Sequence, residues 1–258
     1  MKQELLNIFI IAKYTFFEVL KSRILLNVFF LGMALLFFSY TATEFTYGAA
    51  TKVALDFGLG ALSLSAVGIA IFIGVNIVNK EIESRTIYIL LSQPLSRTAF
   101  LIGRVTGMSI LLLVNILILG VLTLLIYFLF GGEFQPLIIW CVVFSFVEAV
   151  IVLNIAVLFS LITNITMSVV YTLIVFTIGH SINDAIEMTN TSYKVFNPIV
   201  KSFAVFIPNF SKINIKSFVL YQKNLDLSYL VGALSYGLFY IMIIMLISSL
   251  IFKNKDLN

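Results

Sequence analysis

Long apolar stretches alternate with short polar connections along the whole chain. The apolar stretches lie at about residues 24–42, 55–78, 105–130, 136–160, 166–183 and 228–252. A helix needs roughly 20 apolar residues to cross the hydrocarbon core of a bilayer, and each stretch comes near that length. The pattern therefore predicts an all-α membrane protein of six transmembrane helices, which form one domain over residues 1–258.

The N-terminal segment, residues 1–22, has a different pattern. Charged residues interrupt its apolar positions, so it does not have the continuous apolar core of a cleaved signal peptide. At about 100° per residue, one side of a helix carries Leu5, Phe9, Ala12, Phe16 and Leu20, and the other carries Gln3, Asn7, Tyr14, Glu18 and Lys21. Ile11 and Lys13 depart from this pattern, and we expect Lys13 to extend its ammonium group toward water. The segment is predicted to be an amphipathic helix in the cytoplasmic interface of the membrane.

Composition agrees with a lipid environment. The chain is 61% hydrophobic and 11% charged, with a mean hydropathy of +1.10, whereas a soluble domain is about one quarter charged. The net charge of +4 does not indicate a nucleic-acid partner, because the basic residues are scattered at membrane edges and form no continuous basic face.

Lysine and arginine positions predict the orientation, since short cytoplasmic loops carry an excess of both. With the two termini inside, ten of the 16 basic residues are cytoplasmic: Lys2, Lys13, Lys21, Arg23, Lys80, Arg85, Arg97, Arg104, Lys253 and Lys255. The opposite orientation would place the four basic residues of segment 79–104 outside. We therefore expect both termini in the cytoplasm.

That segment, NKEIESRTIYILLSQPLSRTAFLIGR over residues 79–104, lies between the second and third spans. Residues 80–92 are predicted to be a helix that Pro94 ends. Ser96 suits the N-cap of a new helix that runs through Arg97 into the third span. Gly103 and Gly107 are spaced to let another helix approach closely. Two interpretations follow: an interfacial helix whose charges reach water, or a lever that transmits force from a soluble partner.

The same segment resembles the signature of type-2 ABC transporter permeases, an acid-rich helix followed by L-L-x-x-P-x-S-R and a glycine with a basic residue. The most similar branch is that of the NosY-like permeases. IPNFSKIN in the last outer loop and LIFKNKDL at the C-terminus are similar to further parts of the family pattern. Thr86 departs from it, since the family often has glycine there.

The resemblance implies that the segment is the coupling helix that docks on the ATPase subunit. Polar contacts with the ATPase would come from Glu81, Glu83 and Arg85, and groove-filling side chains would be Ile82, Ile87 and Leu90. The turn would be fixed by Pro94, Ser96 and Arg97. A second, smaller contact would come from the TNIT connection, around Asn164 and Ile165.

The resemblance also implies partners. The chain has no G-x-x-x-x-G-K-[ST] phosphate loop, so ATP and Mg²⁺ would bind two copies of a separate ATPase attached to a permease dimer, and this chain would not be an enzyme by itself. It would be a multi-pass exporter subunit of the bacterial cytoplasmic (inner) membrane that works by alternating access. NosY-like systems are associated with the assembly of a copper enzyme in the cell envelope, and a periplasmic accessory protein would be a further partner. The wider family exports drugs, peptides, lipids and polysaccharides, so the substrate stays open.

Polar residues inside the spans are candidates for function, because a charged group there is costly. Glu148 falls near the middle of the fourth span, and Asn115 of the third span comes to a similar depth, so these two spans are predicted to pair. Three roles are open for Glu148: a neutral acid bonded to a neighbouring helix, a position in a substrate path or dimer interface, and proton coupling. Asn76 and Asn154 are expected to form hydrogen bonds between helices.

Other polar features favour no catalytic or metal site. His180 and Cys141 are single residues of their kind, so neither builds a metal cluster; His180 is expected to be an interfacial polar residue and Cys141 a buried apolar one. In the predicted outer loop, residues 184–227, a short helix between Pro198 and Pro208 would lie on or dip into the outer leaflet. The alternative functions are an ion-coupled carrier or channel without an ATPase, and, less supported, a membrane enzyme.

Overall fold

The structure, a computed structural model, describes residues 2–21, 30, 32–34, 36–38, 40–42, 45, 50–83, 96–191, 207–221 and 224–254. In this part the chain is helical apart from short connections, with no strand, and the predicted all-α class is confirmed. The elements are α1 (Lys2–Leu20), α3 (Ala50–Glu83), α5 (Arg97–Leu129), α6 (Pro136–Ile162), α7 (Ile165–Thr191), the 3₁₀ turn η2 (Phe210–Lys212), α9 (Lys216–Leu220) and α10 (Leu227–Asn254).

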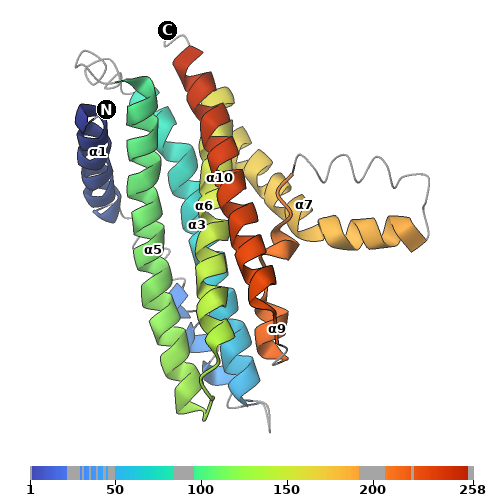
Figure 1. Cartoon of the computed structure of the whole chain (residues 1–258). Coiled ribbons are helices and arrows are strands. Elements are labelled where there is room, and N and C mark those ends of the chain that lie inside the picture. The colour runs from blue at the N-terminus through green and yellow to red at the C-terminus, as the bar shows by residue number, and fades with distance from the viewer. Residues whose placement is uncertain are drawn as a thin grey trace.

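Five of these helices, namely α3, α5, α6, α7 and α10, are long and apolar enough to cross a membrane. This is the architecture of a multi-pass helical membrane protein. Much of the predicted first span, residues 24–42, lies outside the described residues. The long helices form one bundle, with α1 beside α5 and with the last part of α7 projecting away from the other helices (Figure 1).

Helix boundaries differ from the predicted spans because a drop in hydropathy marks the edge of the apolar region and not the end of a helix. α3 continues to Glu83, so the first residues of the predicted helix 80–92 extend α3. α5 begins at Arg97, as the predicted cap at Ser96 requires, so this helix is longer than the apolar span 105–130. α7 continues to Thr191, so the predicted outer loop 184–227 begins later than expected.

α6 lies at the centre of the bundle. The apolar windows of α3 and α6 are each 72% buried inside the protein, against 17% for that of α10. α6 carries apolar residues around its whole circumference and contacts α3, α5, α7, α9 and α10, as expected for a fully buried helix. Residues placed on α6 are therefore enclosed by protein more than by lipid.

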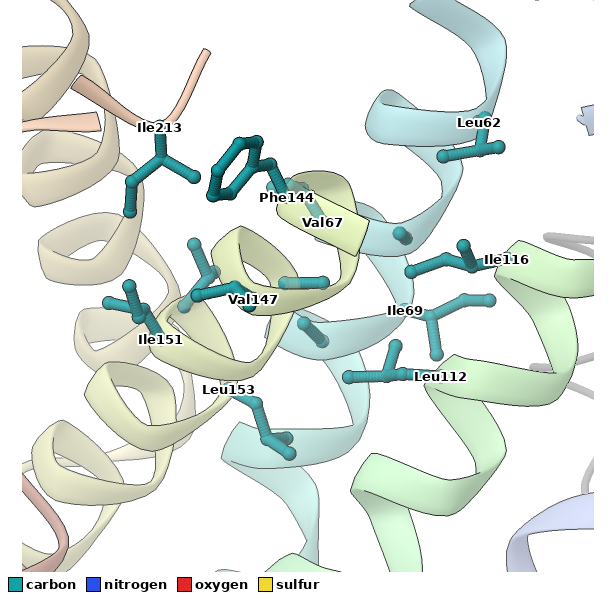
Figure 2. Close-up of a cluster of buried hydrophobic side chains, with 14 of the residues drawn as sticks. Leu62, Val67, Ile69, Leu112, Ile116, Phe144, Val147, Ile151, Leu153 and Ile213 are labelled. Carbon is teal, nitrogen blue, oxygen red and sulfur yellow. The ribbon is translucent and has the colours of Figure 1, made fainter. Parts of the chain in front are cut away.

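The predicted pairing of the third and fourth spans is correct only in part. α5 and α6 are joined by a tight turn in which Gly131 adopts a φ of 80°, and the two helices touch. α3 packs against both of them: its residues Leu62 and Ile69 face Ile116 and Leu112 of α5 (Figure 2), and its other side contacts α6. A tight turn fixes the direction of the next helix but leaves room for a third helix to enter between the two.

The connection before α10 enters the bundle. The helix predicted between Pro198 and Pro208 lies almost wholly outside the described residues. Beyond it, the stretch from η2 to α9 contributes the fully or almost fully buried side chains Phe210, Ile213, Ile215 and Val219. Figure 2 shows the ring of Phe144 on α6 directed toward Ile213. This connection, residues 207–221, is referred to below as the buried connection.

Candidate functional site

The start of α5 has the cap that the sequence predicts. The Ser96 hydroxyl accepts a hydrogen bond of 3.2 Å from the backbone N–H of Ala99, which satisfies one of the free donors of the first turn. The next residue, Arg97, donates through Nη1 to the carbonyl oxygen of Lys253 at 3.2 Å. Phe100 stacks on Phe252 with ring centroids 6.2 Å apart. The first turn of α5 is therefore fastened to the last turn of α10.

The predicted ATPase-contacting residues fall into three groups. Glu81, Ile82 and Glu83 form the last residues of α3. The positions outside the described residues are Arg85, Ile87, Leu90 and Pro94. Asn164 lies in the short turn between α6 and α7, and Ile165 begins α7; the Asn164 carbonyl accepts from the backbone N–H and the hydroxyl of Ser168, both at 2.9 Å. α3 and α6 end, and α5 and α7 start, at the same end of the bundle. All the described residues of these groups therefore lie at that end.

The glycine pair of α5 receives α1. A Cβ atom at Gly103 would lie 2.8 Å from Cβ of Ile11, and one at Gly107 would lie 2.5 Å from the carbonyl oxygen of Ala12. The prediction of a close helix approach is confirmed, and the partner is the N-terminal helix. Ile11, which breaks the amphipathic pattern of α1, is explained by this contact.

An ion pair adds to the same junction. Nη1 of Arg104 lies 2.6 Å from Oε2 of Glu18 and also donates to the Thr15 hydroxyl at 3.4 Å. The buried side of α1 consists of Ala12, Thr15 and Val19, whereas Leu5, Phe9 and Leu20 stay exposed. Ala12 thus faces α5, and most of the predicted lipid-facing side remains free of protein.

Glu148 and His180 form the second candidate site. Oε1 of Glu148 lies 2.8 Å from Nε2 of His180, so α6 and α7 are joined by a charged or strongly polar bond. The Glu148 side chain is 6% exposed and that of His180 is 28% exposed. The expectation that Glu148 bonds a neighbouring helix is confirmed, and the residue that it bonds is His180.

Aromatic rings and the buried connection enclose this pair. The His180 ring stacks on Phe210 with centroids 5.4 Å apart and meets Phe176 edge-on at 4.7 Å. The Ser211 hydroxyl donates to the His180 carbonyl at 2.7 Å. A Cβ at Gly179 would lie 2.5 Å from the Pro208 carbonyl oxygen. Only a glycine allows the connection to lie this close to α7.

A neighbouring set of polar groups holds the same connection to α7 and α10. The Asn209 amide nitrogen Nδ2 donates to Oδ1 of Asn183 at 2.7 Å, and its backbone N–H donates to the Tyr236 hydroxyl at 2.8 Å. Asn209 is only 5% exposed. The connection is therefore held by hydrogen bonds to both α7 and α10.

Asn115 does not join this site. Its Nδ2 donates to the Ser65 hydroxyl of α3 at 3.0 Å, because α3 lies against the inward side of α5. The expected interhelical bonds of Asn76 and Asn154 are also wrong: each amide donates to a carbonyl four residues earlier in its own helix, that of Phe72 or Val150. An amide side chain in a helix has such a carbonyl within reach whatever lies across from it.

Comparison of the chain with protein-family models and with curated protein sequences gave no match. The functional assignment therefore rests on the residues and their arrangement.

Sequence reasoning singled out Glu148 and His180 separately and missed that they meet. A usable signal was present: Glu148 precedes the end of α6 at Ile162 by 14 residues, and His180 follows the start of α7 at Ile165 by 15. In two antiparallel helices joined by a short turn, residues that are equally far from the turn lie beside each other. The contributions of Phe210 and Asn209 carry no comparable signal, because they depend on how the connection enters the bundle.

Proposed function

We propose that the chain is the membrane-embedded permease subunit of an ATP-driven exporter, and that a separate ATPase binds the end of the bundle where α3 ends and α5 begins. The observation that carries the proposal is the geometry of this end. α3 has 34 residues and α5 has 33, which is about 50 Å of helix at 1.5 Å per residue. The hydrocarbon core is only about 30 Å thick.

Both helices are therefore longer than the apolar core is thick, and the sequence of α3 becomes polar after Val78, with Asn79 and Lys80. The acidic residues Glu81 and Glu83 lie in the extension of α3, and Arg97 is the first residue of the extension of α5. The chain between Glu83 and Arg97 connects these two extensions, so a displacement there would act on both helices. This arrangement favours a lever over a simple interfacial anchor.

Force applied at this end would reach other helices. Arg97 bonds the last turn of α10, and Arg104 bonds Glu18 of α1. A displacement of the start of α5 therefore acts on α1 and α10 together, as a rigid-body change between two packed states requires. ATP and Mg²⁺ belong to the ATPase, and the substrate would be moved outward through a dimer of this chain, in a bacterial cytoplasmic membrane.

Affinity purification from native membranes in mild detergent tests this proposal. Wild type and a Glu81→Lys, Glu83→Lys variant are compared for co-purification of a P-loop ATPase and for ATPase activity. The matched control is Glu133→Lys, a charge reversal in the exposed turn at the opposite end of the bundle. We expect wild type and the control to retain the ATPase, and the double variant to lose at least about tenfold in affinity, which corresponds to about 1.4 kcal/mol.

Wild type without an ATPase, or equal binding by all three proteins, would remove the support for this function. An ion-coupled carrier would then move ahead. The specific observation in favour of that second candidate is the Glu148–His180 pair, since intramembrane ionisable pairs mark ion and proton pathways. Transport by the purified chain alone, in response to an ion gradient and without ATP, would identify it.

A further inference from the structure

A groove lies between α1 and α5, which run side by side (Figure 1), next to the glycine contact that joins them. Its volume is about 310 Å³, at the lower end of the range of small-ligand pockets. Its walls include Phe9, Ala12, Lys13 and Phe16 of α1 with Thr106 and Ile110 of α5. Phe9 is 68% exposed, so the groove opens to the surroundings of the protein along α1.

Lys13 provides the charge of this groove. Of the described residues that line it, only Lys13 is charged, and no described acidic residue forms an ion pair with it. Glu18 of the same helix is bound to Arg104 at 2.6 Å. At about 100° per residue, Glu18 and Lys13 point to opposite sides of α1, so this ion pair lies across the glycine contact from the groove. The Lys13 ammonium is therefore available to an anion.

The rest of the lining offers little to a polar ligand. The other lining residues are apolar except Thr106, and the Thr106 hydroxyl already donates to the Ile102 carbonyl at 2.7 Å. A ligand with many polar groups would give up hydrogen bonds to water and regain few of them, which is costly. The groove therefore fits a molecule with an apolar chain and one anionic group.

We propose that the groove between α1 and α5 is a binding site for a phospholipid whose headgroup carries a net negative charge. An acyl chain packs against Phe9, Phe16 and Ile110, and the headgroup phosphate binds the Lys13 ammonium. Basic residues near a membrane surface attract anionic lipids, and the lysine stem itself covers apolar surface. A zwitterionic phospholipid has the same chains, but its own cation competes with Lys13 for the phosphate, so the anionic lipid is preferred.

This site explains a feature of the sequence that the amphipathic pattern of α1 leaves open. Lys13 interrupts that pattern, and the structure places it at the groove beside the apolar side chains of Phe9 and Phe16. A cation at this point gives the lipid a fixed position on α1. The inference goes beyond the proposed function and does not depend on what the chain transports.

Fluorescence quenching by lipids with brominated acyl chains tests the site. Trp140 is the only tryptophan of the chain, so the variant Trp140→Phe, Phe9→Trp carries its one tryptophan in the groove; we call it the groove reporter. It is reconstituted in vesicles of equal parts phosphatidylglycerol and phosphatidylcholine, in which only one of the two lipids is brominated. Because the lipid composition is the same in both preparations, the ratio of the two quenching efficiencies gives the preference of the groove for anionic lipid.

We expect the groove reporter to prefer phosphatidylglycerol about fivefold, the effect of one basic residue near a membrane surface. Adding Lys13→Gln should abolish the preference, and Lys13→Arg should retain it. Lys21→Gln is the matched control: this exposed lysine follows α1 and does not line the groove, so the preference should stay. The native Trp140 lies near the start of α6, and in the otherwise unchanged chain it should show no preference.

Equal quenching of the groove reporter by the two lipids would overturn the proposal and would show that Lys13 extends to water without selecting a lipid. A preference that Lys13→Gln and Lys21→Gln reduce equally, or that Trp140 shares, would also overturn it, because the attraction would then belong to the charged surface as a whole. Quenching by neither lipid would show that protein covers the groove, with the same consequence.

Should the groove reporter fail to fold, mass spectrometry of the intact protein decides. Wild type and Lys13→Gln are purified from micelles that contain both phospholipids. Wild type should retain bound phosphatidylglycerol, and Lys13→Gln should lose most of it. Equal retention by the two proteins would overturn the proposal.

Discussion

The guanidinium group of Arg97 donates to the backbone carbonyl of Lys253, so the first residue of α5 caps the end of α10. These residues are 156 positions apart in the chain. The last carbonyls of a helix have no partner within the helix, and a cation near them also interacts favourably with the helix dipole. The bond makes the start of α5 and the end of α10 one mechanical unit.

Replacing Arg97 by glutamine should release the end of α10. We expect the free energy of unfolding to fall by about 1 kcal/mol, the usual contribution of one hydrogen bond, and amide hydrogen exchange to increase in the last turn of α10. Arg97→Lys is the control, because it keeps a cation near the helix end and should retain part of the stability. Unchanged exchange in α10 for Arg97→Gln would show that the bond contributes nothing.

Adding one methyl group at Gly107 should separate α1 from α5. The new Cβ would lie 2.5 Å from the Ala12 carbonyl, and overpacking of this kind costs about 1–3 kcal/mol. Denaturation in detergent and protease cleavage within α1 measure the effect. Gly68→Ala is the matched control: no heavy atom lies within 4 Å of its new Cβ, and alanine should stabilise that helix by about 0.5–1 kcal/mol. Equal effects at the two positions would contradict the glycine contact.

The Asn115–Ser65 bond should contribute modestly to the packing of α3 on α5. Hydrogen bonds between membrane helices average about 0.6 kcal/mol in double-mutant cycles. A cycle of Asn115→Ala, Ser65→Ala and the double variant should therefore give a coupling free energy of about 0.5–1.7 kcal/mol. A coupling near zero would mean that the two side chains find other partners once separated.

Gly179→Ala should loosen the buried connection. Its Cβ would meet the Pro208 carbonyl oxygen and the Phe210 ring, both at 2.5 Å. We expect hydrogen exchange to increase across residues 207–221 and the free energy of unfolding to fall by about 1–3 kcal/mol. Gly232→Ala, where nothing lies within 4 Å of the added atom, serves as the control. Unchanged protection from hydrogen exchange in residues 207–221 would show that the added methyl group does not disturb the buried connection.

Local pattern was a good guide where a feature depends on neighbouring residues. Ser96 caps α5 as expected, and the Gly103–Gly107 spacing does receive a helix. The same reasoning failed for Asn76 and Asn154, since a side-chain amide bonds its own helix when no partner is positioned across from it. The pattern around His180 gave no sign that it bonds Glu148, because that contact depends on how α7 packs on α6.

The sequence by itself determined the helical membrane architecture, because apolar stretches of sufficient length have few other stable forms in lipid. It also determined the tight turn at Gly131 and the cap at Ser96, which depend on a few adjacent residues. The tertiary structure decided which helices meet: α3 packed against both α5 and α6, α1 on the glycines of α5, and Glu148 beside His180. These contacts join residues far apart in the chain, and their distances follow from how whole helices pack and not from any local pattern.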